Sequence, residues 1–185
     1  MTKIQKGKIY HHLGRAGGID YKKRIWGCDF QYNDGGRSKY FKGTSGDCVV
    51  RAISIASGFD YKSVYDDLFN LNQNYIDDHN NKLSRQMELR NQTSPRNGNF
   101  KQVYHQYIID IGFKWVPLMT IGSGCKYHLR KDEVPNGTAI LSLSRHLTCV
   151  VDKVINDIYN PDRQGMRCIY GYYQKEAQWT YLLKR

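Results

Sequence analysis

Cys48 stands where a free thiol can become a nucleophile. It follows the glycine of a short loop, Gly46, and opens a segment typical of a helix, Cys48–Ser57, which ends at Gly58. The unpaired N–H groups and the dipole at a helix start stabilise a thiolate, and the N–H of Cys48 points to where an oxyanion forms in acyl transfer. Gly46 leaves one side of the sulfur open to substrate. The neighbouring Asp47 is expected to cap the helix and point away from the thiol.

His146 and Asp157 supply a candidate base and a residue to orient it. The sequence predicts two strands, His146–Val151 and Val154–Tyr159, joined by a two-residue turn. With that turn, Asp157 lies on the same sheet face as His146 and diagonal to it, about 7–8 Å away at the backbone. Asp157 can then accept the Nδ1 hydrogen of His146 and leave Nε2 for the thiol. A structural role is the alternative for Cys48 or His146 alone, but the three residues together favour a catalytic triad.

Further helices and strands must position these side chains. Asp60 is expected to cap a second helix with one apolar face, and Asn99 a third helix that ends at Gly112. The remaining expected strands are short and rich in β-branched or aromatic residues: Phe113–Ile121, Thr138–Ser144, Arg167–Tyr173 and Gln178–Leu183. Because helices come first and strands second, the sequence predicts an α+β fold. In it, an N-terminal helical half carries the nucleophile and packs on a C-terminal, mostly antiparallel sheet.

The 185 residues are expected to form one domain with two distinctive segments. Residues 1–43 are a basic N-terminal extension, and a hairpin is expected around the Asn-Asp-Gly-Gly sequence at 33–36. Residues 70–98 are polar and are expected to be a surface insertion, a kind of segment that often carries specificity.

The charge and the cysteines narrow the class of protein. The net charge is +11, and residues 1–45 contain ten Lys or Arg against three Asp, which favours anionic partners; nucleic acid is the less favoured of these. The five cysteines show neither CxxC nor zinc-site spacing, so reduced thiols are expected and no metal or organic cofactor. The chain has no membrane-spanning apolar run and no secretory signal, which predicts a cytoplasmic protein without a membrane partner.

The order Cys, His, Asp carries a family likeness. Gly-Asp-Cys opening a helix, followed by His-x5-Asp-x4-Asp across a hairpin, resembles the papain-like cysteine peptidase superfamily, and most closely its small bacterial and phage members. The likeness spans roughly residues 44–173 and implies a single papain-like domain. It also implies that Cys48 is the nucleophile, His146 the base and Asp157 its orienter. A phage-encoded member would act in the cytosol of the bacterial host.

The sequence departs from the family at the oxyanion hole. Papain-like enzymes usually place a glutamine six residues before the nucleophile, and Lys42 occupies that position. Thr44, Gln31 or Asn33 are the candidate substitutes, and a hole built from backbone N–H groups alone is the alternative.

The predicted activity is hydrolysis of an amide, isopeptide or thioester bond in a peptide or protein substrate, through an acyl-thioester on Cys48. One alternative applies the same chemistry to peptidoglycan, as amidases and endopeptidases of the NlpC/P60 kind do. The other alternative belongs to a different class: a non-catalytic cationic protein on a degraded peptidase fold, which grips nucleic acid or an acidic partner through residues 1–45.

Overall fold

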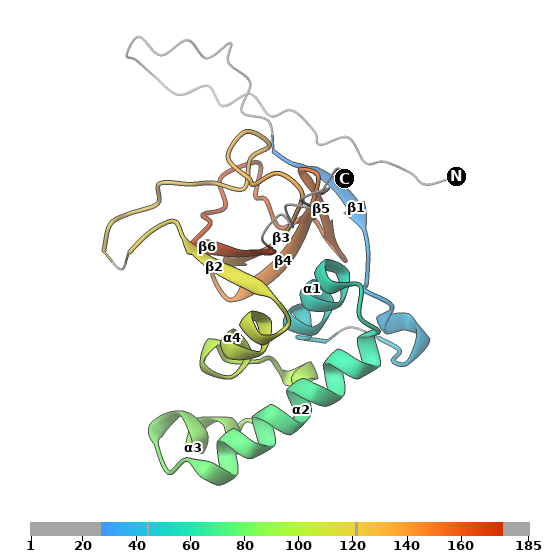
Figure 1. Ribbon diagram of the computed structural model, residues 1–185, viewed down its shortest axis with the longest axis vertical. Helices are drawn as coiled ribbons and strands as arrows, with labels where there is room; N and C mark the ends of the chain where they lie inside the picture. The colour runs from blue at the N-terminus through green and yellow to red at the C-terminus, as the bar shows by residue number, and fades with distance from the viewer. Residues whose placement is uncertain (1–26, 44, 121, 176–185) are drawn as a thin grey trace, which may run out of the picture.

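The computed structural model of the protein describes residues 27–43, 45–120 and 122–175 (Figure 1). In this part of the chain, four α-helices precede all but one of the six strands, so the α+β class and the order of its halves agree with the sequence prediction. The helices are α1 Cys48–Ser57, α2 Tyr61–Asp78, α3 Lys82–Leu89 and α4 Lys101–Asp110, with short 3-10 helices η1 Arg37–Lys39 and η2 Pro95–Asn97. None of the helices described here is long and apolar enough to cross a bilayer.

The strands form one mixed sheet in the order β1-β5-β4-β3-β6-β2. They are β1 Asp29–Tyr32, β2 Phe113–Pro117, β3 Thr138–Leu143, β4 His146–Val151, β5 Val154–Asp157 and β6 Gly171–Lys175. Only the β1–β5 pair is parallel, so the sheet is mostly antiparallel, as expected. The strand expected at residues 178–183 lies outside the described residues.

Two tight turns fix the strands that carry the candidate base and its orienter. Asp152 and Lys153 join β4 to β5 with positive φ angles of 47° and 66°, and Val151 pairs with Val154, which is the predicted register. Positive φ at both central residues gives a turn whose twist matches that of the flanking strands. A second two-residue turn joins β3 to β4, so His146 is the first residue of its strand.

The hairpin expected around residues 33–36 does not form. β1 pairs instead with β5, and the chain after it turns into η1. The physical reason is the Asp34 carboxylate, which accepts hydrogen bonds from the N–H groups of Gly36 and Ser38, both at 2.9 Å. A side chain that accepts from two nearby N–H groups in this way favours a tight local turn over a returning strand.

The helix caps agree with the sequence in one case and differ in another. Asp60 caps α2 by accepting from the N–H groups of Lys62 and Ser63, as predicted. Asn99 does not cap α4, which begins after Phe100 without a side-chain cap. The Asn99 side-chain oxygen instead accepts a hydrogen bond of 2.8 Å from Asn72, because α2 passes beside the start of α4.

Residues 70–98, expected as a polar surface insertion, are largely helical. They contain the second half of α2, all of α3 and η2. Asn72 and Met87 are fully buried within this segment, so it is anchored to the helical half.

The core consists of two apolar clusters, one on each face of the sheet. Val50 and Ile53 of α1 pack with Leu147 of β4 in the first cluster, whereas Val150 of β4 belongs to the second with Ile155 of β5. Full burial of such a side chain stabilises the fold by about 1.5–3 kcal/mol. Because β4 is buried on both faces and α1 packs on it, the elements that carry Cys48 and His146 are held rigidly together.

Candidate active site

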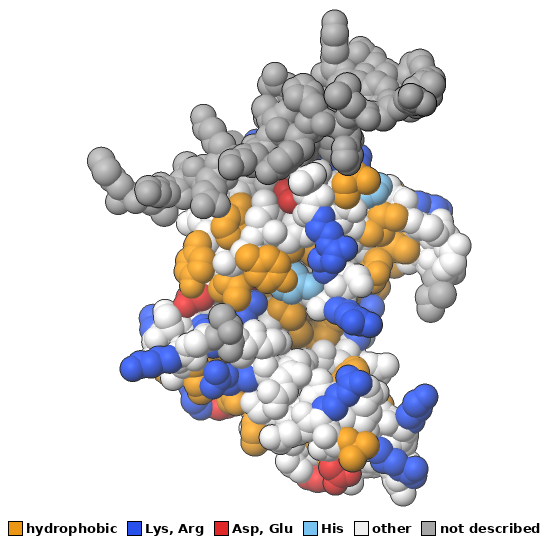
Figure 2. All heavy atoms as spheres, turned by 180° about the vertical axis from the view of Figure 1, so that it is seen from behind, with side chains coloured by type: hydrophobic (Ala, Val, Ile, Leu, Met, Phe, Trp, Pro, Cys, Tyr) orange, Lys and Arg blue, Asp and Glu red, His pale blue; other side chains and the backbone are white. Residues whose placement is uncertain are grey.

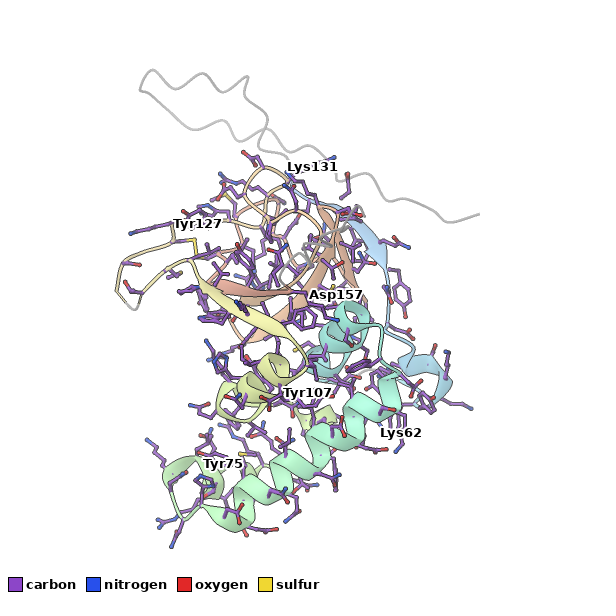
Figure 3. The ribbon with its side chains drawn as sticks, in the orientation of Figure 1. Lys62, Tyr75, Tyr107, Tyr127, Lys131 and Asp157 are labelled. Carbon is purple, nitrogen blue, oxygen red and sulfur yellow. A yellow bond between two sulfur atoms is a disulfide. The ribbon has the colours of Figure 1, made fainter. Side chains whose placement is uncertain are left out.

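The hydrogen bond between His146 and Asp157 forms the centre of the candidate site. Nε2 of His146 lies 2.7 Å from Oδ2 of Asp157, and the two residues are only 7% and 3% exposed. Figure 3 places Asp157 where the sheet meets α1. The predicted contact is therefore present, but the ring nitrogens have the opposite roles, because Asp157 bonds Nε2 and not Nδ1. Asp157 lies on the neighbouring strand, diagonal to His146. Nε2 is the ring nitrogen farther from the His146 backbone, so it is the one that reaches the carboxylate.

Cys48 is the first residue of α1, with a free, partly exposed thiol. Its sulfur is close enough to His146 to affect the pKa of the imidazole. Burial disfavours the imidazolium ion, but the hydrogen bond with Asp157 and the interaction with Cys48 outweigh burial and raise the pKa of His146 to about 9. At neutral pH the structure thus favours a protonated ring beside the sulfur.

Asp47 occupies the N-cap position of α1 but caps nothing, contrary to the sequence expectation. Its fully buried carboxylate is drawn inward, where it contacts Arg51, the Nε of Arg37 at 2.7 Å and the Tyr61 hydroxyl at 2.5 Å. Two guanidinium groups balance the negative charge that otherwise opposes a thiolate at Cys48. The absence of a side-chain cap also leaves the first N–H groups of α1 for a substrate oxygen.

Arg51 connects the nucleophile helix to the acid of the candidate triad. One turn after Cys48, its guanidinium contacts Asp47 and lies 3.5 Å from Oδ1 of Asp157. That same oxygen accepts a hydrogen bond of 2.8 Å from the N–H of Ile158. Sequence reasoning missed Arg51, although a lone arginine in the apolar run Cys-Val-Val-Arg-Ala-Ile, four residues after an aspartate, is a signal of a buried ion pair.

Two tyrosines border the sulfur and the ring. The Tyr159 hydroxyl is 3.4 Å from Nδ1 of His146, and its ring, 49% exposed, lies 5.3 Å from the imidazole between centroids. Tyr104 of α4 is buried, and burial followed by the charge of Cys48 raises the pKa of its phenol. Tyr104 is a core residue, as the sequence predicts. The sequence did not indicate that it lies near Cys48. The two rings place partly apolar walls beside the candidate nucleophile.

The side chains expected to complete the oxyanion hole do not gather at the site. Asn33 donates to Asn156 at 3.2 Å and accepts from the N–H of Gly35 at 2.9 Å, so both ends of its amide are used locally. Gln31 lies on β1, which β5 separates from β4. Thr44 is outside the described residues. The N–H groups at the start of α1 are therefore the donors that the structure offers near Cys48.

The other cysteines differ from Cys48 in exposure or bonding. Cys125 and Cys168 form a disulfide, which contradicts the expectation that all five thiols are free. Their separation of 43 residues gave no local signal of pairing. Cys28 and Cys149 are buried, and burial raises the pKa of each thiol to about 12. Within the described chain, Cys48 is thus the one free thiol that solvent reaches.

The geometry is the basis for any functional assignment. Comparisons with protein-family models, with curated proteins and with solved structures gave no match for this chain. Over the described ranges, no three His, Cys, Asp or Glu side chains group together as metal ligands would. The papain-like resemblance stays a prediction, and the function is argued below from the site itself.

Proposed function

We propose that the protein is a papain-like thiol hydrolase that cleaves an amide, isopeptide or thioester bond of a peptide or protein through an acyl-thioester on Cys48. The observation that carries the proposal is the buried hydrogen bond of 2.7 Å between His146 and Asp157, together with Cys48 at the start of α1, close enough to His146 to affect its pKa. A thiol at a helix start, a histidine beside it and an acid behind the histidine meet the needs of an activated nucleophile.

In the first half of the reaction, the Cys48 thiolate attacks the carbonyl carbon, and the carbonyl electron pair moves to oxygen as the S–C bond forms. N–H groups at the start of α1 stabilise this oxyanion. The intermediate collapses, the C–N bond breaks, and the leaving amine takes the proton from Nδ1 of His146.

In the second half, neutral His146 accepts a proton from water as the water oxygen attacks the thioester carbon. Collapse breaks the S–C bond, releases the carboxylic acid and restores the pair of thiolate and imidazolium. Asp157 accepts the Nε2 hydrogen throughout, which leaves Nδ1, beside the Tyr159 hydroxyl, as the nitrogen that exchanges protons with the reacting atoms. Arg51 and the N–H of Ile158 in turn fix the Asp157 carboxylate.

A thiol-directed activity probe followed by peptide mapping tests the proposal. We expect the probe to modify Cys48 in the native protein and to modify it far more slowly in His146→Ala, with Cys149→Ala as a matched control that keeps the wild-type rate. Labelling that His146→Ala leaves unchanged would contradict the proposal. Nucleic-acid binding that is salt-dependent and survives Cys48→Ala, in a protein whose Cys48 the probe does not modify, would favour the cationic binding protein instead.

A further inference from the structure

Arg145 lies next to the candidate base in a constrained position. It belongs to the two-residue turn between β3 and β4 and immediately precedes His146. Its φ angle is +55°, a left-handed conformation that is uncommon for a residue with a side chain. The side chain is exposed, and none of the carboxylates in the described ranges forms an ion pair with it.

Arg167 brings a second guanidinium to the same turn. Its Nη2 donates a hydrogen bond of 2.6 Å to the carbonyl oxygen of Ser144, the residue before Arg145. Its Nε is buried without a hydrogen-bond partner, and again no carboxylate of the described residues pairs with it. Arg167 is partly exposed, and in the described structure only its Nη2 has a hydrogen-bond partner, so the guanidinium keeps donors for a further acceptor.

Tyr159 lies beside the candidate base. Its hydroxyl lies 3.4 Å from Nδ1 of His146. Burial and the charges of Asp157 and Cys48 raise the pKa of this phenol, whereas the positive charges of Arg167 and Arg51 act in the opposite direction. The carboxylate of Asp157 pairs with His146 and Arg51, and among the described residues it forms no ion pair with Arg145 or Arg167.

We propose that Arg145 and Arg167 form an anion-binding subsite beside His146, and that the substrate is an acidic peptide with a carboxylate close to the scissile bond. This inference rests on the hydrolase function proposed above. A planar guanidinium binds a carboxylate through two parallel hydrogen bonds, which gives direction as well as charge. Lys and Arg side chains are spread over much of one face of the molecule, as Figure 2 shows, and they attract any anion without selecting its position. The proposed subsite differs from this general charge because it would hold a carboxylate at one place, beside His146.

Alkylation of Cys48 by two matched reagents tests the subsite without knowledge of the natural substrate. Iodoacetate carries a carboxylate and iodoacetamide a neutral amide of nearly the same shape. In both cases the sulfur forms a bond to the CH2 carbon and iodide leaves. The ratio of the two rate constants at Cys48, measured by peptide mapping at low salt, reports the attraction of a carboxylate to the site. The iodoacetamide rate alone reports the reactivity of the thiol.

We expect the ratio to fall about threefold in Arg145→Gln and further in the double variant with Arg167→Gln, a size within the range for an exposed ion pair. Dividing by the iodoacetamide rate of the same variant removes any change in the reactivity of the thiol itself. Arg90→Gln is the matched control, because this substitution removes the same charge from a residue that follows α3, far from the sheet (Figure 1). Arg145→Gln carries the test even if Arg167→Gln fails to fold, since the Arg145 side chain makes no hydrogen bond in the described structure.

A competition experiment separates an acidic peptide from other anions. Hexaglutamate should slow alkylation of Cys48 by iodoacetamide in the wild type and not in Arg145→Gln. Protection by a single-stranded oligonucleotide but not by hexaglutamate would overturn the peptide assignment.

The outcomes distinguish the two proposals. A Cys48 that reacts rapidly with iodoacetamide, with the same ratio in Arg145→Gln and Arg90→Gln, overturns the subsite and leaves the hydrolase intact. A Cys48 no more reactive than Cys28 overturns the hydrolase, and the acidic-substrate inference falls with it.

Discussion

Two pairs of arginines flank the candidate site and differ in their partners. Arg37 and Arg51, the inner pair, are buried and both contact the Asp47 carboxylate. Arg145 and Arg167, the outer pair, lie by the turn before His146, and no carboxylate of the described chain pairs with them. A buried guanidinium must pair with a carboxylate inside the protein, whereas a guanidinium that is exposed to solvent is hydrated and can bind a ligand. The inner pair therefore holds the geometry, and the outer pair is suited to recognition.

Arg51→Met should produce the largest effect and should separate the two pairs most clearly. It leaves the buried Asp47 carboxylate with one fewer guanidinium and removes the ion pair with Asp157. Removing one partner of a buried ion pair lowers the free energy of unfolding by about 3–5 kcal/mol. Arg145→Gln should change the free energy of unfolding by less than about 0.5 kcal/mol, as a surface change does. Urea unfolding of both variants checks this, and equal losses of stability would remove the distinction between the pairs.

Asp157→Asn should lower the rate of the chemical step by about a hundredfold, within the range for loss of acid–base function. The amide keeps the shape of the side chain but no longer stabilises the charged ring, so the pKa of His146 should fall. A single-turnover assay with a small thioester measures the step. Asn156→Asp, added to the Asp157→Asn variant, moves the carboxylate one residue earlier on β5. This positional control should not restore the rate. A variant of Asp157 with wild-type rates would remove this residue from the mechanism.

The raised pKa of His146 predicts a pH dependence of stability. Its folded pKa of about 9 lies above the unfolded value of about 6.5, so the imidazolium contributes fully below pH 6.5 and is lost as pH rises through 9. The free energy of unfolding should fall by about 3 kcal/mol more in the wild type than in His146→Gln over this window. Parallel profiles for the two proteins would mean that His146 is not held as an ion.

Local features of this fold were predictable, and long-range contacts were not. The β4–β5 register follows from a two-residue turn and strand parity, so the sequence placed His146 and Asp157 on one face. The start of α1 at Cys48 was equally local. In contrast, β1 pairs with a strand more than 120 residues away, and nothing in its own residues indicated that partner.

The same limit applies to the candidate site. The inward turn of Asp47 and the contact of Arg51 with Asp157 depend on where β5 ends relative to α1, which the spacing of residues does not encode. The Cys125–Cys168 pairing is likewise a tertiary contact. Which ring nitrogen faces the acid is set by the diagonal separation of the strands, and reasoning from a general triad assigned it the wrong way round.

The reactivity of the free thiols in the native protein tests the central claim most directly. Iodoacetamide at pH 6.5, with mass-spectrometric mapping over time, should modify Cys48 at least about tenfold faster than Cys28 or Cys149, because only Cys48 joins a helix start to a protonated histidine. His146→Ala should abolish most of that difference. Equal labelling of all three thiols, or a Cys48 that stays unmodified until the protein unfolds, would contradict the account.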